Sequence, residues 1–289
     1  MVKKMKTFNK IGIYSSAKNK KILQISSQVE EIINNLGKKY FHPKSSVTSE
    51  GKNKSFSDPY VLKNADLIVA IGGDGTLLSS ARKFGLKGVP ITGINLGNLG
   101  FLTDIAPEEI TSSLVEILLG NYKLDSRFFL EGKINKENKP NIALNEIVIH
   151  SGSVAQLAEY ELYIDDNFVY RQKADGIIIS TPTGSTAYAL SGNGPIVHPD
   201  SKSITLLPMF PHSLNARPLV INERKVIKVV IKDKSYLSLD SHNNYKLKIN
   251  DEVIIKKSSS ELKLIHPKEH DFFSACRNKL GWSLGLPEK

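Results

Sequence analysis

A glycine-rich turn that contains one aspartate is the first feature of the sequence that could carry chemistry. The residues Gly72-Gly73-Asp74-Gly75-Thr76 follow a strand-like segment, 66–71, that is apolar from Leu67 onward, and open a helix-like segment. Glycines let the backbone approach a ligand closely, and the free N–H groups of a helix start bind phosphate. Because a carboxylate repels phosphate, we expect Asp74 to meet a hydroxyl proton or a divalent metal ion. The alternative is that Asp74 only caps the helix.

A second glycine-rich segment follows the next predicted strand and runs from Gly93 to Phe101 as GINLGNLGF. Ligands of open α/β sheets collect at the carboxyl ends of the strands. If the two strands are neighbours, both glycine segments border the same pocket; otherwise this one only shapes a loop. The chain contains neither G-x-x-x-x-G-K-[ST] nor G-x-G-x-x-G, which argues against P-loop enzymes and the dehydrogenase fingerprint.

Two polar motifs lie in the second half of the chain. Asn145-Glu146 interrupts the apolar strand predicted at 142–149. Consecutive strand residues face opposite sides, so we expect one of the two to be buried and to need a partner, unless this is a solvated edge strand. Asp175-Gly176 and the run from Ser180 to Tyr188 place hydroxyls at a strand end before a short helix. Such a turn forms a polar pocket or, alternatively, only caps the helix.

The histidines do not indicate a hydrolase. No G-x-S-x-G elbow is present, and His198, His212 and His266, each beside a proline, are interpreted as loop residues.

The order of predicted elements indicates two domains. Strand-like segments at 10–14, 66–71 and 89–94 alternate with helix-like segments at 20–36, 76–84 and 107–119, which predicts a doubly wound α/β sheet. After Phe128 the strands are short and regularly spaced, which predicts a β-sandwich. We therefore expect an α/β domain at 1–127, a β-sandwich at 128–271 and a segment at 272–289 that packs back on the first domain. The predicted strands of the second domain lie at 142–149, 160–164, 168–171, 176–180, 226–231, 236–239, 245–249, 253–256 and 262–265.

Composition narrows the class of protein. The net charge of +10 suggests nucleic acid, but only six of the 39 basic residues are arginines and the lysines are spread along the chain, so we expect no nucleic-acid partner. No run approaches the ~20 apolar residues of a membrane span. A single cysteine, Cys276, gives no disulfide and no metal cluster. We expect a cytoplasmic protein with no membrane partner and no metal ion held by the protein alone.

Taken together, the motifs resemble those of the NAD kinase family. The resemblance rests on the two glycine segments, on Asn145-Glu146, and on Asp175-Gly176 followed by Thr183-Gly184-Ser185-Thr186-Ala187-Tyr188. Stretches 207–212 (LPMFPH) and 216–221 (ARPLVI) add to it. The likeness runs from about Ile11 to Leu286 and is closest to the ATP-dependent proteobacterial branch. The Gly-Asp-Gly turn alone is shared with lipid and sugar kinases.

The resemblance implies an active site in a crevice between the two domains of a homo-oligomer, a dimer or tetramer. It implies that the 2′-hydroxyl of NAD attacks ATP, with Mg²⁺ or another divalent metal bound to ATP, giving NADP. Asp74 corresponds to the catalytic base. Lys173 stands where relatives have arginine, and His242 where proteobacterial relatives have glutamine. The positions implied to bind nucleotide are Gly73, Asp74, Gly75, Asn145, Glu146, Lys173, Asp175, Thr186, Ala187, Tyr188, Ala189, Leu190 and Ser191.

Two alternatives remain on the residues alone. One is a lipid or sugar kinase that shares the glycine-aspartate turn. The other is a protein that binds NAD or nucleic acid without catalysis.

Overall fold

The chain forms two compact units, and the second is inserted into the first. The computed structural model describes residues 5–52, 54–97, 100–135, 137, 140–152, 157–213 and 215–282. Unit 1 consists of Met1–Ser126 and Glu261–Lys289, and unit 2 of Arg127–Ser260. None of the helices in the described ranges has the length and apolar character required to cross a membrane.

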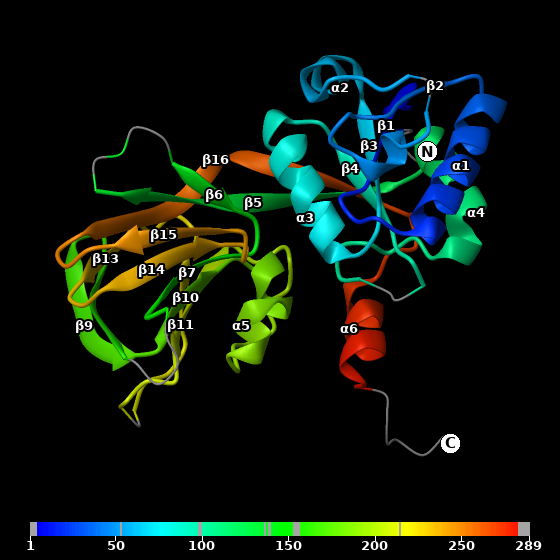
Figure 1. Cartoon of the computed structure of the whole chain (residues 1–289). Helices are drawn as coiled ribbons and strands as arrows, with labels where there is room; N and C mark the ends of the chain where they lie inside the picture. Colours follow the sequence, from blue (N-terminus) through cyan, green and yellow to red (C-terminus); the bar gives the residue numbers. More distant parts are fainter. Residues whose placement is uncertain are drawn as a thin grey trace, which may run out of the picture. The chain divides into compact units, whose positions relative to one another are not determined.

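Unit 1 is built on a parallel sheet with the strand order β2-β1-β3-β4 (Figure 1). The end of β16 pairs with β4 in parallel, at Leu264 and Ile91. All five residues of β3 are buried, as expected for a strand covered on both faces. The α/β architecture predicted for the first part of the chain is confirmed. The strands are β1 (Lys10–Tyr14), β2 (Lys39–Phe41), β3 (Leu67–Ile71), β4 (Ile91–Ile94) and β16 (Glu252–His266).

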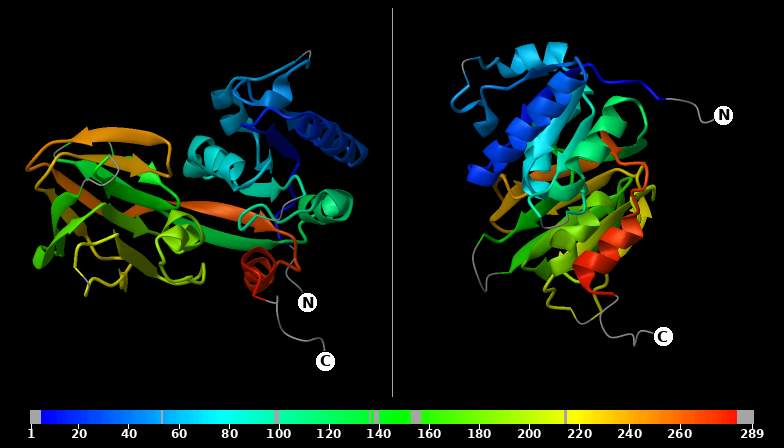
Figure 2. Two further views of the ribbon diagram at one scale, coloured as in Figure 1. Left: turned by 60° about the horizontal axis from the view of Figure 1, so that its bottom comes forward. Right: turned by 90° about the vertical axis from the view of Figure 1, so that its right-hand side faces the viewer.

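Helices cover both faces of this sheet (Figures 1 and 2). The helices α1 and α4 bury their apolar sides against β1 and β3 in one core, while α2 and α3 lie on the other face. Helix α1 begins where Asn19 accepts from the Lys21 N–H and ends before Gly37, whose φ is +66°. The helices are α1 (Lys20–Asn35), α2 (Asp58–Asn64), α3 (Asp74–Lys83), α4 (Ile110–Leu118) and α6 (Phe272–Leu280), with 3₁₀ turns at Val47–Ser49, Gly85–Lys87 and Pro107–Glu109.

Unit 2 contains two antiparallel layers around one apolar core, so the predicted β-sandwich is confirmed. A six-stranded sheet has the order β12-β11-β10-β7-β14-β15, and the other layer contains β13, β8 and β9 beside the first part of β16, with β5 and β6. Alternate residues of both layers fill the core. The elements are β5 (Lys123–Ile134), β6 (Asn141–Ala143), β7 (Glu146–His150), β8 (Ala158–Ile164), β9 (Asn167–Ala174), β10 (Gly176–Ser180), a 3₁₀ turn (Thr183–Thr186), α5 (Tyr188–Ser191), β11 (Ser203–Met209), β12 (Leu219–Asn222), β13 (Ile227–Ile231), β14 (Ser235–Leu239) and β15 (Asn243–Leu247).

Two strand predictions were wrong, and both errors have a physical cause. The strand predicted at 142–149 is two strands, because Leu144 and Asn145 give their N–H groups to the Asp240 carboxylate instead of a neighbouring strand. The segments predicted at 253–256 and 262–265 form one continuous strand, β16, across a polar stretch. The strands β2, β5, β11 and β12 were not predicted. In β11, Pro208 lies within the sheet opposite Ile177, a position that proline seldom takes.

Candidate active site

The glycine-aspartate turn lies at the carboxyl end of β3, beside the end of β4. These strands are parallel neighbours, and the Gly72 N–H donates to the Ile94 carbonyl at 2.9 Å. The two glycine segments therefore follow neighbouring strands, which was the condition for them to lie side by side. Gly72 has a φ of +147°, and a Cβ there would lie 2.4 Å from the Thr76 hydroxyl. A side chain at this position would push Thr76 and the start of α3 away from the sheet.

Asp74 reaches across this turn to the loop that follows β4. Its carboxylate accepts from the backbone N–H groups of Phe101, Leu102 and Thr103 at 3.0, 3.1 and 3.3 Å, and from the Thr103 hydroxyl at 3.4 Å. A Cβ at Gly100 would lie 2.2 Å from the carboxylate, so only glycine leaves room for it. Helix α3 has Gly73 as its N-cap, without a side-chain cap. Asp74 therefore fixes a loop and does not cap its own helix.

A lysine from the far end of the chain lies beside this carboxylate. The Lys279 Nζ is 3.8 Å from Asp74 Oδ2 and lies over the Phe101 ring, 4.9 Å from its centroid. Both side chains are about one-third exposed, at 33% and 30%. The open end of β3 thus presents a negative charge that is fixed by hydrogen bonds and a positive charge beside it. Sequence reasoning missed Lys279, because it is one of many lysines and no motif surrounds it.

In unit 2, a second carboxylate fixes Asn145-Glu146. Asp240 accepts from the backbone N–H groups of Leu144, Asn145 and Glu146 at 2.9, 2.8 and 3.2 Å. Asn145 and Glu146 are 7% and 2% exposed, and β7 lies between β10 and β14. The edge-strand alternative is therefore wrong, and both side chains are buried where one was expected. Asp240 was not predicted, since a single aspartate in a turn gives no sequence signal.

The hydroxyl-rich turn packs directly on the same backbone. The Thr181 hydroxyl donates to the Leu144 carbonyl at 2.7 Å, and the Thr181 N–H donates to the Asn145 carbonyl at 2.9 Å. A Cβ at Gly184 would lie 2.2 Å from that Asn145 carbonyl oxygen. Two motifs that are far apart in the sequence therefore form one rigid structure in unit 2.

Two cavities lie on the outer face of the six-stranded sheet, and Tyr188 borders both. Because side chains alternate along a strand, Glu146, Val148 and His150 of β7 share this face. A cavity of about 500 Å³ is lined by Val148, His150, Asp175 and Tyr188, among others. A second one, of about 400 Å³, is lined by Tyr188 and Ser191 together with residues 207–211 and 216–218. Such volumes suit small-molecule ligands.

The Asn145-Glu146 pair, which lines neither cavity, has two buried acceptor atoms without a hydrogen-bond partner within the described ranges of the chain: Asn145 Oδ1 and Glu146 Oε2. Leaving a buried polar atom unpaired costs about 1–3 kcal/mol, so the site is suited to a ligand that brings donors. Burial, and then the nearby charge of Asp240, raise the pKa of Glu146 to about 8, although a hydrogen bond from the Tyr188 backbone opposes the shift. Glu146 is therefore largely protonated at neutral pH in the absence of ligand.

The remaining predicted positions are less closely grouped. Lys173 has a side chain that is 60% exposed, lies 3.9 Å from Glu159 and lines neither cavity. Ala189 packs against Val148 and holds α5 on the sheet (Figure 1). The exposed His242 has its Nδ1 3.1 Å from the Asp240 carbonyl. A Cβ on Gly73 or Gly75 would meet nothing within 4 Å. Thr186 and Ala187 join the turn to α5, which contains Leu190.

Comparison with known families agrees with these motifs. Residues 7–122 match the ATP-NAD kinase N-terminal domain, and residues 144–267 match the ATP-NAD kinase C-terminal domain. The chain belongs to the NAD kinase family. The NAD kinase of Tolumonas auensis is 48% identical over 76% of this chain and 78% of its own length. That of Teredinibacter turnerae is 47% identical over 78% of this chain and 79% of its own.

Solved structures of this family share the fold. The structure of yeast NADH kinase complexed with NADH aligns with a TM-score of 0.86 over 98% of this chain and 90% of that one, and its 24% identity shows the fold alone. The NAD kinase of Archaeoglobus fulgidus in complex with ATP aligns with a TM-score of 0.75 and 26% identity, over 93% of this chain and 99% of that one.

The close packing of the Thr181–Ser185 turn on the Asn145 backbone predicts that adding one methyl group at Gly184 destabilises unit 2. Gly184→Ala drives a Cβ into a backbone carbonyl, and we expect it to lower the melting temperature, because overpacking costs about 1–3 kcal/mol. The matched control is Gly192→Ala, where the Cβ meets the end of the flexible Leu207 side chain at 2.8 Å. Thermal unfolding of both variants without ligand checks this. Equal melting temperatures would contradict the rigid packing.

The raised pKa of Glu146 predicts a pH-dependent stability. Between its ordinary value of 4.5 and about 8, the unfolded chain loses this proton while the folded chain keeps it, so stability falls as pH rises. Each pKa unit corresponds to about 1.4 kcal/mol. Glu146→Gln removes this loss. The difference between the unfolding free energies of the variant and the wild type should therefore shift in favour of the variant by at most about 4 kcal/mol between pH ~5 and ~8. Denaturant unfolding across this range measures the difference. Glu108→Gln, at an exposed site, is the control, and parallel curves for Glu146→Gln and wild type would contradict the assignment.

Proposed function

We propose that the chain transfers the γ-phosphoryl group of ATP to the 2′-hydroxyl of the adenosine ribose of NAD, producing NADP and ADP. The observation that carries this proposal is the Asp74 carboxylate, held by three backbone N–H groups beside the start of α3. The free N–H groups of that helix start suit phosphate. Asp74 itself suits a hydroxyl that must lose a proton. Family membership supports the same assignment.

The proposed role of Asp74 is to orient the hydroxyl and to accept its proton late in the reaction. A carboxylate is too weak a base to deprotonate a ribose hydroxyl in the ground state. Phosphoryl transfer is largely dissociative, so the proton leaves as the new P–O bond forms. Oδ2 of Asp74 accepts one N–H group and keeps capacity for a hydroxyl proton. A general base contributes about 10²–10⁴ in rate, while positioning supplies ~7–11 kcal/mol.

We propose that unit 2 binds NAD on the outer face of the six-stranded sheet. The unpaired acceptors Asn145 Oδ1 and Glu146 Oε2 would take donors from the adenine amine and the ribose hydroxyls. Tyr188 offers a half-exposed ring to a base or sugar, and Asp175 borders the same cavity. Lys173 and the rest of 186–191 stay in this proposal as positions implied by the family.

A divalent metal fits this site as a companion of ATP. Mg²⁺ prefers oxygen ligands and is held by one or two carboxylates together with phosphate oxygens. Because the proposed role of Asp74 leaves Oδ2 to the hydroxyl, such an ion would be held chiefly by the phosphate oxygens of ATP. Such an ion would neutralise charge on the transferred phosphoryl group. We also propose that the protein acts in the cytoplasm and that it forms a homo-oligomer. Sedimentation of the pure protein would test the oligomeric state.

The rival activities are separated by one assay. A lipid or sugar kinase would label diacylglycerol or fructose 6-phosphate from radiolabelled ATP, and a binding protein would label nothing. We expect label in NADP alone. The archaeal relative crystallised with ATP is a NAD kinase, which supports ATP as the donor.

Replacing the proposed base predicts a loss of turnover without a loss of fold. We expect Asp74→Asn to lower kcat by at least about 100-fold, because the amide cannot accept a proton. Its affinity for NAD should stay near that of the wild type. NADP formation and calorimetric binding of NAD measure the two quantities.

Thr103→Val is the matched variant, because it removes only the hydroxyl bond to Asp74 Oδ1. We expect it to lower kcat by less than Asp74→Asn does. If Asp74→Asn turns over at a normal rate, Asp74 has no catalytic role.

A further inference from the structure

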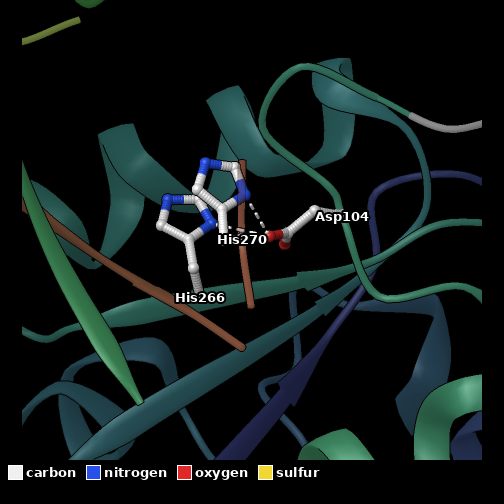
Figure 3. A group of neighbouring side chains, drawn as sticks. All are labelled: Asp104, His266 and His270. Carbon is white, nitrogen blue, oxygen red and sulfur yellow. Dashed lines mark hydrogen bonds and ion pairs between the residues drawn. The ribbon is translucent and has the colours of Figure 1, made fainter. Parts of the chain in front are cut away.

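A buried group of two histidines and one aspartate lies in unit 1, outside the residues that the proposed reaction uses. Figure 3 shows the His266 and His270 rings stacked side by side, each with its Nδ1 toward Asp104. The ring centroids are 3.9 Å apart. Asp104 Oδ2 is 2.9 Å from the His266 Nδ1 and 2.7 Å from the His270 Nδ1. The side chains are 11%, 1% and 7% exposed for Asp104, His266 and His270.

We propose that Asp104, His266 and His270 bind a zinc-like divalent transition-metal ion. Two imidazole nitrogens and one carboxylate form a ligand set typical of Zn²⁺ and related ions, and unlike the all-oxygen set of Mg²⁺. The three side chains offer ligand atoms that lie within 4.8 Å of one another. The sequence His266-Pro267-Lys268-Glu269-His270 has the H-x₃-H spacing found in zinc sites.

The distances from the Asp104 carboxylate to the two histidine nitrogens are close to those between neighbouring ligands of a metal ion. Metal–ligand bonds of ~2.0–2.1 Å place neighbouring ligand atoms about 2.9–3.3 Å apart in octahedral or tetrahedral geometry. The two nitrogen–oxygen distances, 2.9 and 2.7 Å, lie at and just below this range, and the ligand nitrogens of the two histidines lie within 4.8 Å of each other. Without an ion the two nitrogen–oxygen contacts are hydrogen bonds, so an entering ion displaces the Nδ1 protons to solvent. The remaining coordination positions belong to water or to Asp104 Oδ1, which is buried without a hydrogen-bond partner in the described residues.

A second aspartate lies behind one of the three proposed ligands. The other nitrogen of His266, Nε2, faces Asp125 Oδ2 at 3.7 Å. A carboxylate behind a ligating histidine is the usual outer-shell partner in metal sites.

The position of this site gives the ion a structural task. Asp104 directly follows the three residues whose N–H groups hold Asp74. His266 is the last residue of β16, and His270 lies just before α6. An ion here would tie the loop that orients Asp74 to the C-terminal part of unit 1. His266 was interpreted from sequence as a loop residue, and this was wrong.

Direct binding to the full chain tests the proposal without relying on kinase activity. The protein is freed of metal with EDTA and titrated with Zn²⁺ against a chromogenic chelator. We expect His270→Gln to weaken the tightest site by more than about 100-fold, since even outer-shell changes cost ~10–100-fold. Asp125→Asn should weaken it by ~10–100-fold. His198→Gln, at an exposed histidine of unit 2, should bind as the wild type does.

Two measurements on the wild type keep the test decisive if a variant fails to fold. Co²⁺ should give the visible absorption of a nitrogen- and oxygen-coordinated ion, and one equivalent of Zn²⁺ should raise the melting temperature. The proposal is overturned if the metal-free wild type takes up no equivalent of either ion. It is also overturned if folded His270→Gln binds Zn²⁺ as tightly as the wild type.

Discussion

A carboxylate that accepts hydrogen bonds from three consecutive backbone N–H groups fixes the key loop in each unit. Asp74 holds residues 101–103 and Asp240 holds residues 144–146. The backbone N–H groups of a loop have no neighbouring strand to accept their hydrogen bonds, and here a carboxylate accepts them instead. Hydrogen bonds to a charged acceptor are stronger than those to a neutral one. The two loops therefore keep their shape without regular secondary structure. In both units, the residues proposed for chemistry lie in or beside such a loop.

The sequence predicted the parts of this arrangement that depend on local pattern. The spacing of apolar residues predicted α1 and β3. The glycine-aspartate motif predicted that Asp74 lies between a strand and the start of a helix. What it could not give were contacts between distant residues. Nothing around Lys279 or Asp240 distinguishes them from other charged residues in the chain. Likewise, the break between β6 and β7 exists because Asp240 takes the N–H groups of a strand-like segment.

Glu146 illustrates how folding stability and ligand binding oppose each other. The unpaired oxygen and the raised pKa both result from burying a carboxyl group with too few donors. Such a group weakens the folded state above its unfolded pKa. A ligand that donates hydrogen bonds to this group would remove that free-energy cost. The stability lost on folding would then be recovered as binding free energy. Asn145, with its own unpaired Oδ1, adds to the same effect.

The insertion of unit 2 into unit 1 bears on how the chain matures during synthesis. Residues 127–260 emerge from the ribosome before the segment beginning at Glu261 that completes unit 1. Until then, β4 lacks the partner that Leu264 later provides at Ile91, and an unpaired parallel strand invites association with other chains. The inserted unit is therefore expected to fold first and the surrounding one last. A nascent chain stalled before Glu261 would be the form most prone to aggregate.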